Sequence, residues 1–242
     1  MTFRHSIAEF IVAPRVYLRH RRLKRLRSID KQERLDLQGD RDIEWSWVAS
    51  RLPNGPGKVL DFGNGESALG LIASRRGFHV TAVDLRPARW PYVHDRLTFV
   101  QGDLMELSWD PDYFDLVINC STVEHVGLAG RYGITKERTD GDLEVMARLH
   151  ELMKANAVMI LTVPIGRDSL FPPLHRVYGS QRLPALLAGY SVEAEEYWIK
   201  DNKNRWVSCT QTQATNFEAQ PGYGRAIEMV YALGCFVLRC LK

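Results

Sequence analysis

The sequence lacks the features that mark membrane-spanning and secreted proteins. No apolar run approaches the roughly 18 residues that a transmembrane helix needs. The first 20 residues contain neither a long apolar core nor a small-residue cleavage site. The four cysteines form no CxxC pair and no dense disulfide framework. We therefore expect a reduced, cytoplasmic protein.

Acidic residues are nearly absent from the first 27 positions. This segment holds eight Lys or Arg residues against Glu9 alone, so it carries +7, while the whole chain carries +3 and the remainder therefore −4. Such a cationic segment predicts either peripheral contact with an anionic membrane, at its inner face, or a solvated leader, and the sequence leaves both open. Its aromatic residues precede most of the charge, which disfavours nucleic acid as a partner.

From residue 40 onward, apolar segments with strand character alternate with segments of helical spacing. Helices are expected over 40–52, 67–76, 141–154 and 180–190, and strands over 58–62, 78–85, 97–103, 113–121, 157–164, 191–199 and 229–241. This alternation predicts an α/β fold with a doubly wound, Rossmann-like, mostly parallel sheet of seven strands. We expect residues 1–39 to be a basic extension, residues 40–242 to be a single domain, and residues 200–225 to be a loop insertion within it.

A glycine-rich turn follows the first expected strand, in the stretch "GKVLDFGNGES" at residues 57–67. Gly63, Gly65 and Ala68 fit the dinucleotide pattern G-x-G-x-x-A, so a nicotinamide-dependent oxidoreductase is one interpretation. However, Asp61 lies two residues before the first glycine. A carboxylate about 5 Å from one phosphate charge costs roughly 3 kcal/mol at an effective dielectric near 20. The turn therefore disfavours a diphosphate, unless Asp61 merely caps the next helix near Ser67.

Acids close three successive expected strands, at Asp61, Asp84 and Asp103. Ligands of such sheets bind at the carboxyl ends of the strands, so these acids are expected to face one ligand. Asp84 lies about twenty residues past the glycines, where a ribose-binding acid belongs. S-adenosylmethionine combines a ribose and an adenine with an ammonium and a sulfonium, and the two cations suit Asp61. The acids therefore favour this cofactor over NAD.

With these residues, the stretch 45–240 resembles the class I S-adenosylmethionine-dependent methyltransferases. "VLDFGNGES" is similar to their first motif, with Ser67 in place of the usual third glycine, and "VTAVDL", "FVQGD" and "FDLVINCSTVEHVG" are similar to the next three. The turn "MKANA" departs from the usual "L-K-P-G-G". The resemblance implies that Asp61, Gly63 and Gly65 contact the methionine part of the cofactor, and that Asp84 and Leu85 contact its ribose. It also implies that Asp103 and Leu104 contact the adenine, and that Asn119 and Cys120 line the sulfonium side.

A narrower resemblance lies further along the chain. The strings "STVEHVGLAGRYG", "DGDL", "VPIGRD" and "HRVYGSQRLP" look like the branch of this class known as DUF268. Members of that branch often accompany genes for surface-polysaccharide assembly. The resemblance implies a sugar acceptor, in a surface glycan or its lipid-linked precursor. A non-catalytic module that binds the cofactor is the remaining alternative.

A hydroxyl acceptor needs a group that takes up its proton, and histidine is the commonest such group. His125 follows Glu124 just past the fourth expected strand, and His175 follows the fifth, so these three residues are the catalytic candidates. They are similar to the E-x-x-E-H pattern of some metal-dependent methyltransferases, although Ser121 replaces the first carboxylate. A divalent metal at this place is therefore a less favoured alternative, and the sequence leaves it undecided.

The substrate candidates surround these histidines. "GRYG" at 130–133 and "TDGD" at 139–142 are candidates for a lid, although Asp142 also suits a helix N-cap. Side chains suited to gripping a hydroxylated or anionic acceptor are Arg131, Tyr132, Arg176, Tyr178 and Arg182. Candidates for stacking on a sugar are Tyr197, Trp198 and Trp206, with Trp198 also expected in the core.

Overall fold

The computed structural model describes residues 40–88, 90, 92–130, 132–201, 203, 205–219 and 231–242, which all belong to one compact unit. The basic extension over 1–39, including residues 1–27 for which membrane contact is expected, lies outside the described residues, and so does Arg131. The boundary at residue 40 therefore stays a prediction. No helix among the described residues is long and apolar enough to cross a bilayer.

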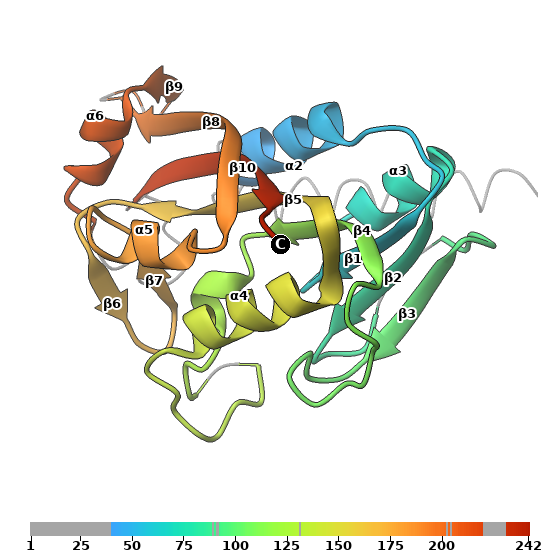
Figure 1. Ribbon diagram of the computed structural model, residues 1–242. Helices are drawn as coiled ribbons and strands as arrows, with labels where there is room; N and C mark the ends of the chain where they lie inside the picture. Colours follow the sequence, from blue (N-terminus) through green and yellow to red (C-terminus); the bar gives the residue numbers. More distant parts are fainter. Residues whose placement is uncertain are drawn as a thin grey trace, which may run out of the picture. The chain divides into compact units, whose positions relative to one another are not determined.

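The described residues form one mixed sheet of eight strands in the order β3-β2-β1-β4-β5-β10-β8-β9 (Figure 1). The strands are β1 (Lys58–Phe62), β2 (His79–Asp84), β3 (Leu97–Gln101), β4 (Phe114–Cys120), β5 (Met153–Ile165), β8 (Tyr190–Lys200), β9 (Trp206–Cys209) and β10 (Ala232–Cys240). Strands β1 to β5 pair in parallel, whereas β10 runs antiparallel between β5 and β8. The predicted mostly parallel α/β sheet is confirmed, with one strand more than expected.

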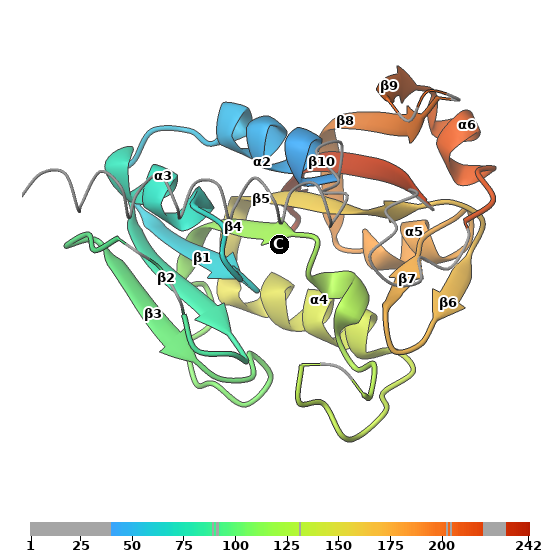
Figure 2. The ribbon, with the colours of Figure 1, turned by 180° about the vertical axis from the view of Figure 1, so that it is seen from behind.

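Helices cover both faces of this sheet (Figures 1 and 2). On one face lie α2 (Asp40–Arg51) and α3 (Leu69–Arg75), and on the other α4 (Gly141–Leu152) and α5 (Arg182–Leu186). Neighbouring residues of one strand enter different cores: Val59 packs with α2 and α3, and Leu60 packs with α4 and α5. Central parallel strands are therefore apolar on both faces, which is why they read as continuous apolar runs.

Two segments differ from the expectation. The expected loop over 200–225 contains β9 and a short helix α6 (Gln211–Thr215), which begins with a capping box between Thr210 and Gln213. After β5 the chain forms a hairpin of β6 (Ser169–Phe171) and β7 (His175–Val177). These elements are too short for a hydrophobic period to show in the sequence, and pairing with neighbouring strands defines them.

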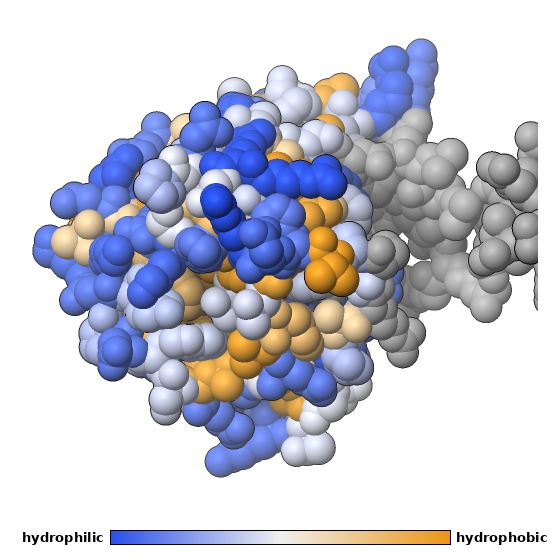
Figure 3. All heavy atoms as spheres, turned by 90° about the vertical axis from the view of Figure 1, so that its right-hand side faces the viewer, coloured by the Kyte–Doolittle hydropathy of each residue, from blue (hydrophilic) through white to orange (hydrophobic). Residues whose placement is uncertain are grey.

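The other end of the sheet is formed by the edge strand β3. Figure 3 shows this side of the molecule, where apolar side chains lie among hydrophilic ones. The exposed apolar residues of the preceding connection are Leu85 and Val93.

The strand order of the sheet reverses between β1 and β4. The chain segments that follow these two strands therefore diverge, and doubly wound sheets bind their ligands at such a point.

The core packing predicts a contrast between two leucines. Leu149 of α4 is fully buried, whereas Leu241 is 55% exposed. Leu149→Ala should lower the free energy of unfolding by about 2–5 kcal/mol because it leaves a cavity, and Leu241→Ala should change it by less than about 0.5 kcal/mol. Urea denaturation measures both, and equal effects of the two substitutions would contradict this packing.

Candidate functional site

A cavity of about 1040 Å³ opens at the carboxyl ends of β1, β2, β3 and β4. The cavity is lined by the glycine turn and by the residues at the ends of β2 and β3. It is also lined by α2, by the segment after β4 and by residues 132–138. It brings together eight of the nine expected cofactor residues: Asp61, Gly63, Gly65, Asp84, Leu85, Asp103, Leu104 and Cys120. Asn119 is buried instead, with its amide nitrogen 3.7 Å from the sulfur of Met146.

The two glycines of the turn are required for different reasons. Gly63 has a φ of +65°, and a Cβ there would lie 2.0 Å from the Cγ2 of Thr122. Gly65 has a φ of +51°, but a Cβ on it would meet no described atom within 4 Å, because this residue faces the cavity. Gly63 therefore lets the turn pack against the end of β4, and Gly65 leaves room for a ligand.

Asp61 lies at the end of β1 and is 2% exposed. Burial raises the pKa of its carboxyl to about 7, the amide of Gly70 opposes this shift and the charge of Asp84 adds to it. Asp61 thus contacts the first turn of α3, as the capping alternative expected, although at Gly70 and not near Ser67. Its Oδ2 atom nevertheless accepts no well-formed hydrogen bond from the described residues. A buried carboxylate with an unused acceptor atom suits a cationic ligand group.

The other two strand-end acids shape the backbone beside the cavity. Asp84 accepts hydrogen bonds from the amides of Gly65 (3.0 Å) and Arg86 (2.9 Å). Asp103 accepts one from the amide of Met105 (2.9 Å), and its Oδ2 lies 4.0 Å from the guanidinium of Arg138. Each carboxylate oxygen has a second lone pair. Both acids can therefore hold their turns and still accept hydrogen bonds from a ligand.

His125 lines the cavity from a 3-10 turn, η1 (Val123–His125). Its Nδ1 atom lies 2.5 Å from the carbonyl oxygen of Leu174, which only accepts, so Nδ1 carries the hydrogen and Nε2 is the basic nitrogen. Nε2 lies 3.5 Å from the Oε1 atom of Glu124, which is 2% exposed. Burial raises the pKa of Glu124 to about 8. The carboxyl of Glu124 is therefore mostly neutral near pH 7, and Nε2 is the nitrogen of His125 that can accept a hydrogen.

His175 lies close to His125, as the sequence predicts, with 6.5 Å between the ring centres. It is buried on β7 and packs against the ring of Tyr231 at 5.1 Å, and it is not among the residues that line the cavity. In the part of the chain that the structure describes, no three His, Cys, Asp or Glu side chains are grouped to hold a metal ion. Glu124, His125 and His175 therefore do not form the metal-binding set that the motif resembled.

Arg176 and Tyr178 occupy structural positions and not the expected substrate site. The guanidinium of Arg176 is buried and donates to the carbonyl oxygens of Val126 (2.6 Å), Arg138 (3.1 Å) and Thr139 (3.0 Å). Tyr178 is fully buried in the core beside α4. Arg176 therefore ties together the two stems of residues 126–139, the connection from which residues 132–138 reach the cavity.

Asp142 is the anionic partner in this region. It accepts two hydrogen bonds from the guanidinium of Arg182, at 2.9 and 2.5 Å, and lies 3.4 Å from the Nε atom of Arg176. Asp142 is fully buried inside α4, whose N-cap is Asp140, so the N-cap expectation was wrong. The guanidinium of Arg182, like that of Arg176, donates its hydrogen bonds to other residues of the protein. The strings "DGDL" and "HRVYGSQR" therefore meet in one largely buried ion cluster beside the stems of residues 126–139.

Two cavity residues of α2 escaped the sequence analysis, Arg41 and Trp45. Arg41 lies 2.5 Å from an oxygen of Glu44, which is fully buried and whose other oxygen accepts the hydroxyl hydrogens of Ser121 and Thr162. Trp45 is 38% exposed, one helical turn after Arg41 and on the same face. The sequence does contain a signal for Trp45. Trp45 and Trp47 point in different directions on a helix, so only one of them can enter the core.

Among the expected aromatic contacts, Tyr132 alone lines the cavity. Its ring lies between the guanidinium of Arg86, at 4.9 Å, and the ring of His125, at 5.4 Å. Tyr197 and Trp198 pack in the core, and Trp206 lies on the edge strand β9. The sheet thus carries the predicted sugar-stacking residues away from the cavity, whereas α2 brings Trp45 to its lining.

The comparisons with known proteins agree with this geometry. A profile of the family described as "Caenorhabditis protein of unknown function, DUF268" matches residues 94–221. No curated protein matches the sequence. The structure is similar to the 1,6-didemethyltoxoflavin-N1-methyltransferase of Burkholderia thailandensis, solved with S-adenosylhomocysteine, with a TM-score of 0.58 and 18% identity over 100% of this chain and 92% of that one.

Two further solved structures share the architecture. An S-adenosylmethionine-dependent methyltransferase of Methanosarcina mazei has a TM-score of 0.52 and 10% identity over 80% of this chain and 97% of that one. Another, from Mesorhizobium loti, has a TM-score of 0.51 and 16% identity over 81% of this chain and 97% of that one. The fold is therefore that of the class I S-adenosylmethionine-dependent methyltransferases.

The burial of Asp61 predicts how stability depends on pH. Because its pKa is raised from 3.8 to about 7 in the folded protein, only the unfolded state ionises between these values. This group therefore destabilises the folded protein by about 1.4 kcal/mol for each pH unit across that window. Asp61→Asn should raise the melting temperature of the ligand-free protein at pH 8, and the gain should vanish towards pH 4.

Asp115→Asn is the control of opposite sign. Burial raises the pKa of Asp115, but the hydrogen bonds from Lys154 and from the amide of Lys58 outweigh burial and lower it. This substitution should therefore lower the melting temperature at pH 8. Thermal melts at pH 4, 6 and 8 measure both variants, and an Asp61→Asn protein that is less stable than wild type at pH 8 would contradict the burial argument.

The ion cluster predicts a second stability effect. Arg176→Met should lower the free energy of unfolding by about 3–5 kcal/mol, because it removes a buried cation and the hydrogen bonds of several carbonyl groups. Arg182→Met should cost less, because the side chain of Arg182 is 27% exposed, against 3% for Arg176. Urea unfolding of the two variants measures the difference, and the reverse order would show that Arg176 does not hold the stems.

Proposed function

We propose that this chain, which belongs to the DUF268 family, is an S-adenosylmethionine-dependent methyltransferase. The observation that carries the proposal is the buried Asp61, whose Oδ2 atom accepts no well-formed hydrogen bond from the described residues and which lines the cavity. The ammonium of the methionine part of the cofactor would pair with this carboxylate. A fold shared with methyltransferases supports the same conclusion.

The remaining lining fits the other parts of this cofactor. Gly65 leaves open space beside the turn, Asp84 offers carboxylate oxygens to ribose hydroxyls, and the exposed face of Leu85 with the buried Leu104 offers an apolar place for adenine. Bound in this way, S-adenosylmethionine supplies a methyl group activated by a sulfonium, and S-adenosylhomocysteine is the product.

His125 is the residue we assign to the proton of the acceptor. Its Nδ1–H donates to the carbonyl of Leu174, so Nε2 is the ring nitrogen that can accept a hydrogen from a hydroxyl. The 3-10 turn and the hairpin hold the imidazole in this orientation, because η1 carries the ring and the residue before β7 carries the carbonyl. Alignment of acceptor and methyl group then contributes to the rate beyond the proton transfer.

We assign the acceptor to a hydroxyl of a sugar, in a surface glycan or a lipid-linked precursor. The indole face of Trp45 suits the apolar face of a sugar ring. Arg41 beside it also lines the cavity, and its side chain, 46% exposed, offers guanidinium donors to sugar hydroxyls. The ring of Tyr132 provides a second aromatic wall. Cytoplasmic location and membrane contact through residues 1–27 stay predictions of the sequence.

The alternatives make different predictions about ligands. A nicotinamide-dependent oxidoreductase would place a diphosphate beside the glycine turn and Asp61, with the electrostatic cost described above. A thermal-shift comparison separates the two: we expect stabilisation by S-adenosylhomocysteine and none by NAD. Stabilisation by NAD alone would overturn the proposal, and a non-catalytic module would bind S-adenosylhomocysteine without transferring a methyl group.

Cofactor binding should depend on pH through Asp61. Its carboxyl must be charged to pair with the ligand ammonium, and its pKa without ligand is about 7. Binding therefore releases a proton, and the affinity for S-adenosylhomocysteine should fall about tenfold for each pH unit below 7 and level off above it. Calorimetric titrations from pH 5.5 to 8.5 measure this slope.

Two variants serve as checks on this slope. Asp61→Asn should bind weakly at every pH, because it cannot supply the charge, whereas Asp115→Asn should keep the wild-type profile. Wild-type affinity that is the same at pH 6 and pH 8 would show that Asp61 does not face the ammonium.

Methyl transfer should depend on His125. With labelled cofactor and a glycan or lipid-linked sugar fraction as acceptor, His125→Gln should lower kcat by about 10²–10⁴-fold, because the base is removed. Its affinity for S-adenosylhomocysteine should stay within twofold of wild type. His150→Gln, in the last turn of α4 and outside the cavity lining, with its Nε2 atom 2.9 Å from the carbonyl oxygen of Leu241, is the control and should keep full activity. Wild-type protein that binds cofactor but labels no fraction would favour the non-catalytic module.

A further inference from the structure

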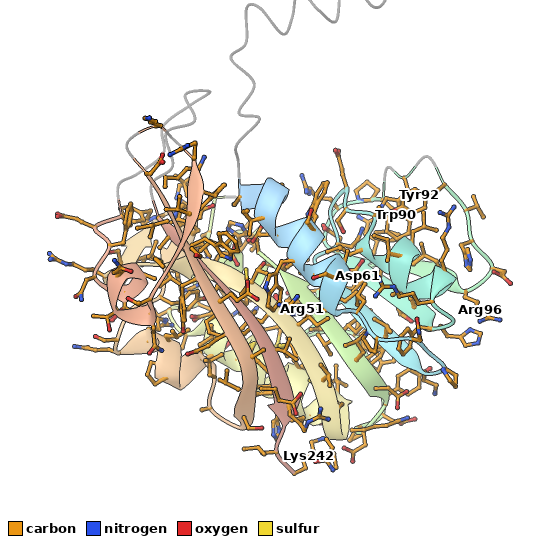
Figure 4. The ribbon with its side chains drawn as sticks, turned by 90° about the horizontal axis from the view of Figure 1, so that it is seen from above. Arg51, Asp61, Trp90, Tyr92, Arg96 and Lys242 are labelled. Carbon is orange, nitrogen blue, oxygen red and sulfur yellow. The ribbon has the colours of Figure 1, made fainter. Side chains whose placement is uncertain are left out.

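An aromatic pair lies in the connection between β2 and β3. The rings of Trp90 and Tyr92 are stacked, with 5.3 Å between their centres and 14° between their planes. Trp90 also meets the edge of Phe99 on β3, at 5.6 Å. Figure 4 shows the labelled Trp90 and Tyr92 side chains beside one another. The described residues of this connection contain no helix, so the pair provides its packing.

Both aromatic residues donate hydrogen bonds to the glycine turn. The indole Nε1–H of Trp90 donates to the carbonyl oxygen of Gly65 at 3.3 Å, and the hydroxyl of Tyr92 donates to the carbonyl oxygen of Ser67 at 2.7 Å. Asp84 accepts the amide of Gly65 at 3.0 Å. The peptide groups on the two sides of Gly65 are therefore held by different partners. Neither aromatic residue lines the cavity, so any effect on a ligand passes through the turn.

The composition of this turn explains why it needs such support. Gly65 adopts a φ of +51° and faces open space, and within the turn its carbonyl oxygen accepts a hydrogen bond from the Nδ2 of Asn64 at 2.9 Å. The third glycine of the methyltransferase motif is replaced by Ser67, whose residue is 7% exposed and whose Oγ has no hydrogen-bond partner among the described residues. The contacts that fix the peptide at Ser67 are its own amide to Asn64, at 3.0 Å, and the hydroxyl of Tyr92.

We propose that Trp90 and Tyr92 are positioning residues that hold the glycine turn in its cofactor-binding conformation and compensate for the missing third glycine. This role rests on the proposed function, since the bound group is the methionine part of the cofactor. Burial and the charge of Asp61 raise the pKa of Tyr92, so its hydroxyl keeps the proton that it donates.

Two conservative substitutions test the pair. Trp90→Phe keeps an aromatic ring but removes the N–H, and Tyr92→Phe removes only the hydroxyl. Each should raise the Kd for S-adenosylhomocysteine about three- to tenfold, the range of one lost hydrogen bond, and the double variant by more. Where an acceptor is available, KM for the cofactor should rise by the same factor while kcat at saturation stays within twofold.

Trp109→Phe and Tyr113→Phe are the matched controls. These residues pack around Phe114, with ring centres 5.6 and 5.0 Å from it, and make no hydrogen bond to the turn. Calorimetry should give them the wild-type Kd. A double variant at positions 90 and 92 with a lower melting temperature but an unchanged Kd would overturn the positioning role, because the pair would then serve stability alone.

Hydrogen exchange of the ligand-free protein separates this inference from the proposed function. The amides of residues 63–68 should exchange at least about fivefold faster in the double variant than in wild type, because the turn loses its outer contacts. Wild-type protein that fails to bind S-adenosylhomocysteine would contradict the proposed function. In that case, hydrogen exchange still tests the role of the pair. Faster exchange of the turn in the double variant would support the inference that Trp90 and Tyr92 hold the turn, and unchanged exchange would overturn that inference.

Discussion

A carboxylate buried at the end of a parallel strand is the constraint on which the site depends. Burial raises the pKa of Asp61 to about 7, so the ligand-free protein holds this acid at an energetic cost whenever it is charged. The neighbouring turn cannot relieve that cost, because its glycines either pack against the end of β4 or face the cavity. A cationic ligand group relieves it, which links the stability of the fold to the chemistry of the cavity.

The second constraint is mechanical and lies on the other side of the cavity. The long connection between β4 and α4 brings Tyr132 and Lys136 to the site, and Arg176 ties its stems through backbone carbonyl groups. Asp142 then holds Arg176 and Arg182 together. Of the residue strings typical of the DUF268 branch, "DGDL" and "HRVYGSQRLP" thus lie outside the cavity lining and fix the connection that reaches it, whereas "STVEHVGLAGRYG" supplies His125 and Tyr132 to the lining. A resemblance to a family points equally to both kinds of residue.

Much of the fold follows from local pattern. Parallel strands that are buried on both faces are continuous apolar runs, and each of the first three ends in an acid at the same edge of the sheet, so Asp61, Asp84 and Asp103 could be placed together before any coordinates. The hairpin of β6 and β7 and the edge strand β9 could not be predicted in this way. Elements of three or four residues carry no period, and pairing with a neighbouring strand defines them.

The sequence by itself determined the class of the fold, the cofactor-facing acids and the pair of candidate histidines. Only the tertiary structure decided which side chains reach the cavity: His125 rather than His175, and Trp45 rather than Trp198. The physical reason is that exposure depends on what packs against a residue from elsewhere in the chain. Glu44 of α2 accepts the hydroxyl hydrogen of Thr162 of β5, which lies 118 residues further along the chain, and no local pattern contains that contact.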